Sequence, residues 1–242
     1  MAADLIVLPS PQAVTEALAD RTATALRTAL QEKNRVTLCV TGGSTPRPAY
    51  QRLAQADGIE WNRVHLFWTD ERSVPPDHPE SNHAMVAESL IRPASIPESN
   101  IHKMPGTCPP DQGAAIYEQA LAQFFGDDLW FDVLHLGMGS DGHTASLFPG
   151  TDALHETQRR VSPGLAPDGA PSRQRVTLTF PALSRSGLCL IAATGAGKRD
   201  AFSSVLDAYD GAGDPPPVAQ VAVEGELTWL VDRELAQDIA DD

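Results

Sequence analysis

The chain has 242 residues, 42% of them hydrophobic and 21% charged, which is the balance of an ordinary globular protein with a sizeable core. Its formal net charge of −14 argues against nucleic acid and anionic membranes as partners. An anionic substrate would therefore need a local group of donors that overcomes the overall field. We expect one domain over residues 1–242.

The cysteines and the start of the chain bear on the compartment. Cys39, Cys108 and Cys189 are odd in number and lack metal-ligand spacing, and the first and last lie in apolar runs. Buried thiols of this kind are typical of a reducing environment. The first residues lack the basic region and long apolar run of a signal peptide, and no stretch approaches membrane-spanning length. We expect a cytoplasmic protein.

Predicted strands and helices alternate along most of the chain. Apolar, β-rich runs predict strands at 5–8, 36–40, 64–68, 131–136, 175–180, 188–193, 218–223 and 227–231. Helical spacing predicts helices at 11–32, 48–56, 81–90, 111–125 and 198–209, the first capped by Ser10. Residues 162–172 and 210–217 are rich in Pro and Gly and predict loops. This alternation indicates an α/β fold with a mostly parallel, doubly wound sheet.

Four motifs each follow a predicted strand directly, at residues 41–46, 69–76, 137–143 and 194–198. In a parallel sheet, ligands bind beyond the carboxyl ends of the strands. Independent loops have no reason to follow this pattern, so we expect the four motifs to form one shared site.

The turn after the strand at 131–136 is the most informative of the four. It reads GMGSDGH over 137–143, and its titratable groups are Asp141 and His143. One carboxylate and one imidazole on a glycine-lined rim are typical of a reaction centre, although Asp141 could be a simple cap and His143 a polar loop residue.

Two common motifs fail at this turn. The glycines satisfy the GxGxxG dinucleotide pattern, but Pro149 and Gly150 exclude the long helix that must follow. A GxSxG serine hydrolase is excluded because Met138 stands at the first glycine position.

The loop at 41–46, TGGSTP, lets the backbone approach a ligand closely before a helix begins. Ser44 or Thr45 can cap that helix, and its first amides suit a phosphate or an oxyanion. An ordinary capped strand–turn–helix connection remains the alternative.

The motif TDERSVPP, at 69–76, puts three charges at a strand end, where Arg72 can grip a phosphate or carboxylate, oriented by Asp70 or Glu71. A solvated, salt-bridged turn is the alternative. His78 and His83 are too poorly spaced around Pro79 to indicate zinc.

The motif TGAGK, at 194–198, resembles a P-loop but departs from it twice. Ala192 replaces the first glycine, and Arg199 replaces the Ser or Thr that binds magnesium. What remains is Lys198 at a helix N-terminus, a position that disfavours a cation unless an anion binds there. Lys198 is thus a phosphate-ligand candidate, with a solvated lysine as the alternative.

Taken together, these motifs resemble the 6-phosphogluconolactonase family. The matching segments are 41–46, 68–82, 136–150, 175–181 and 194–198, while 227–233 resembles the family's terminal strand, so the resemblance covers essentially the whole chain. It implies the Rossmann-like fold of the sugar-phosphate isomerase/deaminase type. Glucosamine-6-phosphate deaminases share several of these motifs, but they carry a glutamate where Phe148 stands and usually an aromatic residue where Arg72 stands.

The resemblance implies hydrolysis of 6-phospho-D-glucono-1,5-lactone to 6-phosphogluconate, a step of the oxidative pentose phosphate pathway. His143 is then the general base, Asp141 its orienting or charge-stabilising partner, and Arg72 an oxyanion candidate. The candidates for binding substrate and phosphate are Gly42, Gly43, Ser44, Thr45, Arg175 and Lys198. No metal or organic cofactor is expected, because the lactone is already electrophilic.

Two other functions remain open at this point. An aminosugar-phosphate deaminase or isomerase is disfavoured by Phe148. A non-catalytic sugar-phosphate sensor is expected to have lost the Asp141/His143 pair, and both residues are present.

Overall fold

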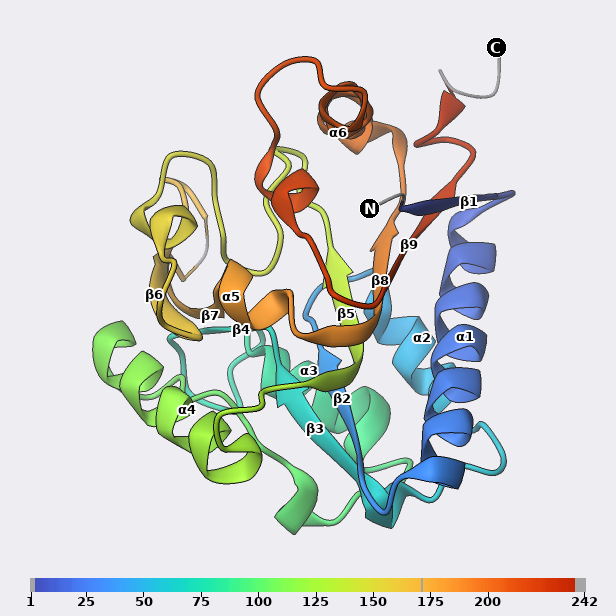
Figure 1. Ribbon diagram of the computed structural model, residues 1–242, viewed down its shortest axis with the longest axis vertical. Coiled ribbons are helices and arrows are strands. Elements are labelled where there is room, and N and C mark those ends of the chain that lie inside the picture. The colour runs from blue at the N-terminus through green and yellow to red at the C-terminus, as the bar shows by residue number, and fades with distance from the viewer. Residues whose placement is uncertain (1–2, 171, 238–242) are drawn as a thin grey trace.

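The computed structural model describes residues 3–170 and 172–237 and has an α/β architecture built on two sheets (Figure 1). The larger sheet has six strands, all parallel, in the order β1-β9-β8-β5-β2-β3. These are β1 (Asp4–Leu8), β2 (Val36–Val40), β3 (Val64–Trp68), β5 (Phe131–Gly137), β8 (Ser186–Ala193) and β9 (Glu226–Asp232). The prediction of a mostly parallel sheet flanked by helices is confirmed.

The central strands form because their residues are apolar on both faces. Every residue of β2 is buried, as expected where helices cover both sides of a sheet. The neighbouring β5 includes a buried histidine, His135, whose ring nitrogens lie 2.7 Å from the Thr22 hydroxyl and 3.3 Å from the Tyr50 hydroxyl. Burial lowers the pKa of His135 to about 3, so the ring is neutral in the folded protein.

Helix α1 (Pro11–Glu32) shows how the sequence specifies the layers. The Ser10 hydroxyl accepts a hydrogen bond from the Ala13 amide at 3.2 Å, and Pro11 occupies the first turn. Residues four apart on one face, including Val14, Leu18 and Leu26, are buried against β9, β8 and β5. The predicted helix and its cap are confirmed.

The other helices are α2 (Pro46–Leu53), α3 (Asn82–Val86), α4 (Pro110–Phe125), α5 (Phe180–Leu183) and α6 (Arg199–Tyr209). Helix α3 continues as a π-helical turn, η2 (Ala87–Ile91). Short 3₁₀ turns are η1 (Trp61–Arg63), η3 (Glu98–Asn100), η4 (Asp152–His155), η5 (Ala196–Lys198) and η6 (Pro217–Gln220). Within the described residues, no helix is long and apolar enough to span a bilayer.

The smaller sheet corrects two predictions. It is antiparallel, in the order β4-β7-β6, and consists of β4 (Asp70–Arg72), β6 (Val161–Leu165) and β7 (Gln174–Leu178). The strand expected at 175–180 therefore belongs to this sheet, ends earlier and is followed by α5. The expected loop at 162–172 begins as β6, an edge strand, where Pro163 is tolerated because its missing N–H faces no partner strand. Helix α4 packs on β6 and β7, on the opposite side of the view from α1 (Figure 1).

A third prediction was wrong as well. Residues 218–223 alternate like a strand, but they form part of η6 and an irregular segment that buries Val218, Val221 and Val223. Prolines 215–217 fix the backbone before this segment, and the Val218 amide donates to the Gly142 carbonyl instead of to a strand. The two cysteines expected in the core, Cys39 and Cys189, are buried free thiols, and Cys108 is half-buried.

Candidate active site

The order of strands places the candidate site between β2 and β5. From β2 the sheet extends to β3 on one side and to β5, β8 and β9 on the other, so the loops after β2 and β5 leave the sheet in opposite directions. This topological switch point is where open α/β sheets bind ligands. The four strands that carry the predicted motifs, β8, β5, β2 and β3, are consecutive in the sheet.

A cavity of about 230 Å³ opens at this point. It brings together most of the predicted site residues, because residues 42–45, Arg72, His143 and Lys198 all line it. Asp141 is not among the lining residues, but it contacts His143, which is. Arg175 is not among the lining residues. The four motifs expected to form one site thus contribute residues to one cavity, although two of these residues, Gly42 and Lys198, lie 156 positions apart in the chain.

The Asp141–His143 pair has the geometry of an oriented base. Asp141 Oδ1 lies 2.5 Å from His143 Nδ1 and also accepts a hydrogen bond from the His143 amide at 3.1 Å. The imidazole packs against the Phe148 ring, with centroids 4.3 Å apart. With Nδ1 held by the carboxylate, Nε2 is the ring nitrogen left for a water molecule or a substrate.

The charge of Asp141 is maintained by this contact. Burial pushes its pKa upward, but the hydrogen bond and the charge of His143 outweigh this effect, and the net pKa lies below its ordinary value. Glycines make the close turn possible: a Cβ at Gly139 would lie 2.1 Å from His143 Nδ1, and Gly142 has φ of +78°.

Tyr50 anchors the start of the loop after β2 through hydrogen bonds to the backbone of Thr41. The Tyr50 hydroxyl accepts a hydrogen bond from the Thr41 amide at 3.0 Å and donates one to the Thr41 carbonyl at 3.1 Å. A Cβ at Gly42 would lie 1.8 Å from Asn82 Oδ1, so only glycine lets this loop approach Asn82. Gly43 has φ of +112°, in the region that favours glycine.

The cap expected at this loop is absent. Thr45 is the N-cap residue of α2, but no side chain forms a capping hydrogen bond there. Prolines at 46 and 48 also remove two amides from the first helical turn, so the helix presents fewer donors than expected. Backbone amides of residues 43–45, which line the cavity, remain the candidates for binding an anion.

Two acidic residues that follow β3 have different surroundings. Asp70 lines the cavity and is 5% exposed, and it accepts hydrogen bonds from the Ser146 hydroxyl at 2.7 Å and from Asn82 Nδ2 at 3.1 Å. Glu71 points away and caps α3, accepting bonds from the amides of Asn82 and His83 at 2.7 Å. Burial raises the pKa of Glu71 despite these bonds.

Arg72 lines the cavity, but neither neighbour orients its guanidinium as expected. Its Nη1 donates to the Glu80 carbonyl at 2.7 Å, while Glu71 contacts only its backbone amide. Arg175 stands directly opposite Arg72 in the β4–β7 ladder and is 5% exposed. Burial and then the charge of Arg72 lower the pKa of Arg175, so the two guanidinium groups lie close enough to act on each other.

Lys198 reaches the cavity from the loop after β8. Gly195, with φ of +91°, turns this loop, and α6 begins directly after Lys198. Burial lowers the pKa of Lys198, and the charge of Asp232 partly offsets that effect.

Sequence reasoning missed Asp70 and Asn82 as residues of the cavity. Asp70 was considered only as a partner of Arg72, and Asn82 only as the end of a matching segment. A Gly-Gly pair after a buried strand was the available signal, because it indicates that something approaches the backbone closely.

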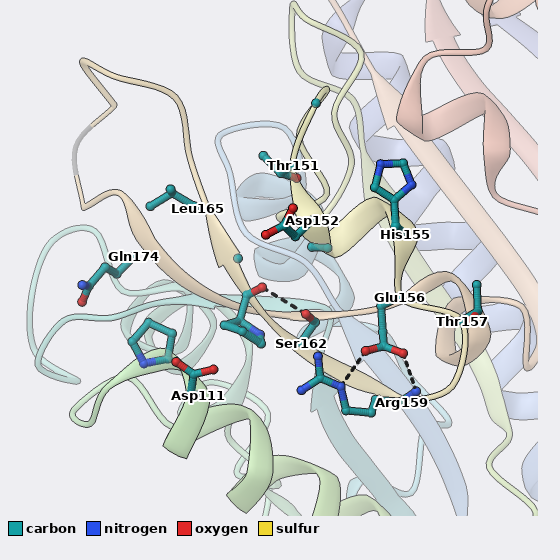
Figure 2. A pocket seen from close by; sticks show the side chains of 15 residues that line it. Asp111, Thr151, Asp152, His155, Glu156, Thr157, Arg159, Ser162, Leu165 and Gln174 are labelled. Carbon is teal, nitrogen blue, oxygen red and sulfur yellow. Dashed lines mark hydrogen bonds and ion pairs between the residues drawn. The ribbon is translucent and has the colours of Figure 1, made fainter.

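A second, larger cavity of about 690 Å³ lies beside the small sheet (Figure 2). It is lined by residues 150–165 in large part, with Asp111 from α4 and Gln174 from β7. Its closest charges satisfy each other: Glu156 accepts hydrogen bonds from Arg159 Nε at 2.6 Å and from the Arg159 amide at 3.0 Å. None of the predicted site residues lines it, so we assign the site by its chemistry and not by cavity size.

Within the described residues, no group of three or more histidine, cysteine, aspartate or glutamate side chains has the arrangement of a metal site.

Comparisons with known proteins agree with this geometry. A family model described as glucosamine-6-phosphate isomerases/6-phosphogluconolactonase matches residues 9–229. A 6-phosphogluconolactonase of Synechocystis sp. is 37% identical over 99% of both chains, and one of Mycobacterium leprae is 36% identical over 99% of both. The crystal structure of 6-phosphogluconolactonase from Thermotoga maritima superposes with a TM-score of 0.84 at 31% identity, covering 96% of this chain and 100% of that one. The chain belongs to the glucosamine-6-phosphate isomerase/6-phosphogluconolactonase family.

Proposed function

We propose that the protein is a 6-phosphogluconolactonase, which hydrolyses 6-phospho-D-glucono-1,5-lactone to 6-phosphogluconate. The observation that carries the proposal is a histidine oriented by a carboxylate on the same small cavity as Arg72 and Lys198. A base facing two cations suits an ester substrate that also carries a phosphate. The names of the similar proteins support the same activity.

In the proposed reaction, His143 Nε2 takes a proton from water as the water oxygen attacks C1 of the lactone. Asp141 keeps Nδ1 protonated and stabilises the imidazolium that forms, as an orienting carboxylate does in other hydrolases. Collapse of the tetrahedral intermediate breaks the C1–ring oxygen bond. The imidazolium returns its proton to that oxygen, which becomes a hydroxyl group of the product.

The charge that develops on the C1 oxygen needs a donor, and our candidates are the amides of Gly43 and Ser44 or the Arg72 guanidinium, since these residues line the cavity. Lys198 is our choice for the phosphate. Arg175 is buried opposite Arg72 and does not line the cavity, so we propose that it adds positive potential there without a direct substrate contact.

The family includes deaminases, and Phe148 argues against that activity. Phe148 is 6% exposed and packs on His143, so no carboxylate stands at the position where the deaminase pattern has a glutamate.

The test is the initial rate of proton release from 6-phosphogluconolactone, with the spontaneous rate subtracted. We expect a clear rate for the unaltered protein, a fall of about 10²–10⁴-fold in His143→Ala, and no deamination of glucosamine 6-phosphate. His155→Gln, at an exposed histidine of the larger cavity, is the matched control and should keep full activity. A folded His143→Ala variant with an undiminished rate would overturn the general base, whereas deamination without lactone opening would overturn the activity.

A further inference from the structure

A buried carboxylate lies beside the loop that carries Lys198. Asp232 ends β9 and is 0% exposed. Because β8 and β9 are parallel and Ala193 pairs with Val231, Thr194, the first residue after β8, lies beside Asp232, the last residue of β9. An aspartate with no solvent contact at a strand end is costly unless its oxygens are used.

One oxygen of Asp232 holds two backbone turns. Oδ1 accepts a hydrogen bond from the Gly195 amide at 3.0 Å and another from the Leu235 amide at 3.1 Å. The first of these bonds fixes the only residue of the loop whose φ lies in the left-handed region, within the described part of the chain. Three residues further on, Lys198 enters the cavity.

The second carboxylate oxygen of Asp232 does not form a hydrogen bond with the loop. Asp232 Oδ2 is buried and has no hydrogen-bond partner among the described residues. Its charge nevertheless acts on Lys198, although the two do not form a direct ion pair in the described structure. Among the described residues, Asp232 therefore supplies a counter-charge to Lys198 without taking a hydrogen bond from it.

We propose that Asp232 is a positioning residue for substrate binding: through Gly195 it fixes the turn that holds Lys198 toward the phosphate of the substrate. The inference rests on the proposed function, in which Lys198 binds that phosphate. Asp232 itself does not line the cavity and acts through the loop. Its effect is consequently on binding, with the groups that carry out the reaction, His143 and Asp141, left in place.

The competing explanation is that Asp232 only closes the turn at Leu235 and so stabilises the fold. The two explanations differ in the kinetic constant that they change. Loss of a contact made equally to substrate and transition state raises KM and leaves kcat, whereas a general loosening of the fold lowers the unfolding temperature and kcat as well.

The experiment compares Asp232→Ala, Asp232→Asn and Lys198→Met with the unaltered protein on 6-phosphogluconolactone, together with their thermal unfolding. Asp232→Ala should raise KM about 5–20-fold with kcat within about threefold, the scale of one charge-assisted hydrogen bond. Asp232→Asn keeps an oxygen for the Gly195 amide and should recover most of that loss. In the Lys198→Met background, Asp232→Ala should add no further increase in KM.

A second variant keeps the test valid if Asp232→Ala fails to fold. Gly195→Ala strains the same turn at its left-handed residue, and the added Cβ meets no atom within 4 Å, so it disturbs only the backbone. It should raise KM selectively as well.

Three results would overturn the inference: an unchanged KM in folded Asp232→Ala, an equal fall in kcat, or additive effects with Lys198→Met. An unchanged KM in Lys198→Met alone would instead show that Lys198 is not the phosphate ligand. If the unaltered protein did not hydrolyse the lactone at all, the proposed function itself would be wrong.

Discussion

The two cavities of this molecule differ in size, position and use of charge. The larger, beside the small sheet, has about three times the volume of the smaller and contains acidic residues, a histidine and an arginine. Its charged groups either pair with each other, as Glu156 does with Arg159, or are exposed to water. In the smaller cavity, His143 from the loop after β5, Arg72 from the end of β4 and Lys198 from η5 converge on one volume.

The difference is the reason why we propose the reaction site from the convergence of groups and not from cavity volume. Groups brought together by the ends of parallel strands face a common point, because the strands themselves are rigid and adjacent. Residues that follow one another along a surface segment, such as 150–157, satisfy their hydrogen bonds locally and have no common target.

Matched substitutions at one aspartate in each cavity test this distinction most strongly. Asp141→Asn should lower kcat about 10–10³-fold with KM within about threefold, since the amide cannot hold His143 in one tautomer or stabilise its cation. Asp152→Asn, at an exposed residue of the larger cavity, should change kcat less than about twofold. Steady-state kinetics on both purified variants provides the comparison, which fails if the two substitutions have equal effects.

Matched glycines give a smaller effect. Gly42→Ala forces a methyl group onto Asn82 and should cost about 1–3 kcal/mol of the free energy of unfolding, together with about a tenfold loss of kcat/KM. Gly150→Ala, in the larger cavity, meets no atom within 4 Å but strains a φ of +72°. It should cost about 1–2 kcal/mol and leave kcat/KM unchanged. Urea unfolding and kinetics on the same samples separate the two. Unaltered kinetics in Gly42→Ala would show that the tight contact with Asn82 does not shape the site.

Matched histidines give the smallest effect, on stability alone. The folded pKa of His135 is about 3 against 6.5 for a free side chain, so the unfolded chain binds more protons between these values. Its contribution to stability is complete above pH 6.5 and decreases as the pH falls toward 3, by about 2 kcal/mol at pH 5.

His135→Gln should therefore reduce the difference in unfolding free energy between pH 7.5 and pH 5 by about 2 kcal/mol. His155→Gln, at an exposed histidine, should leave that difference unchanged. Urea titrations at the two pH values measure it. The buried position of His135 would be wrong if both variants showed the same pH dependence.

The sequence predicted the central strands well for a physical reason. Central strands such as β2 and β5 are mostly buried, mostly apolar segments that lead into a glycine turn, so both the strand and the loop that follows it can be recognised in the sequence. The small sheet could not be predicted from the sequence. Strand β4 consists of three charged residues, and β6 contains Pro163 and Gly164, so neither has the sequence pattern of a strand. Both form because they pair with β7.

The residues of the smaller cavity could be predicted only where, as for the strands, the local sequence carries a pattern. Gly42, Arg72, His143 and Lys198 could be identified because each stands at the end of an apolar run. The role of Asp70 could not, because its hydrogen bonds reach Asn82 and Ser146, which lie 12 and 76 residues away. A contact of that kind depends on the tertiary arrangement and leaves no local pattern.

The pairing of β1 has a consequence for how the protein is made. This first strand lies at the edge of the large sheet, and its neighbour is β9, the last strand described, more than 200 residues later. During synthesis, β1 has no partner strand until residues 226–232, which form β9, have left the ribosome. Strand β9 also carries Asp232, which contacts the Lys198 loop through the Gly195 amide. Contacts of such long range form slowly. The nascent chain can build its central strands early, but β1 and the Lys198 loop acquire their contacts with β9 only at the end of the described chain.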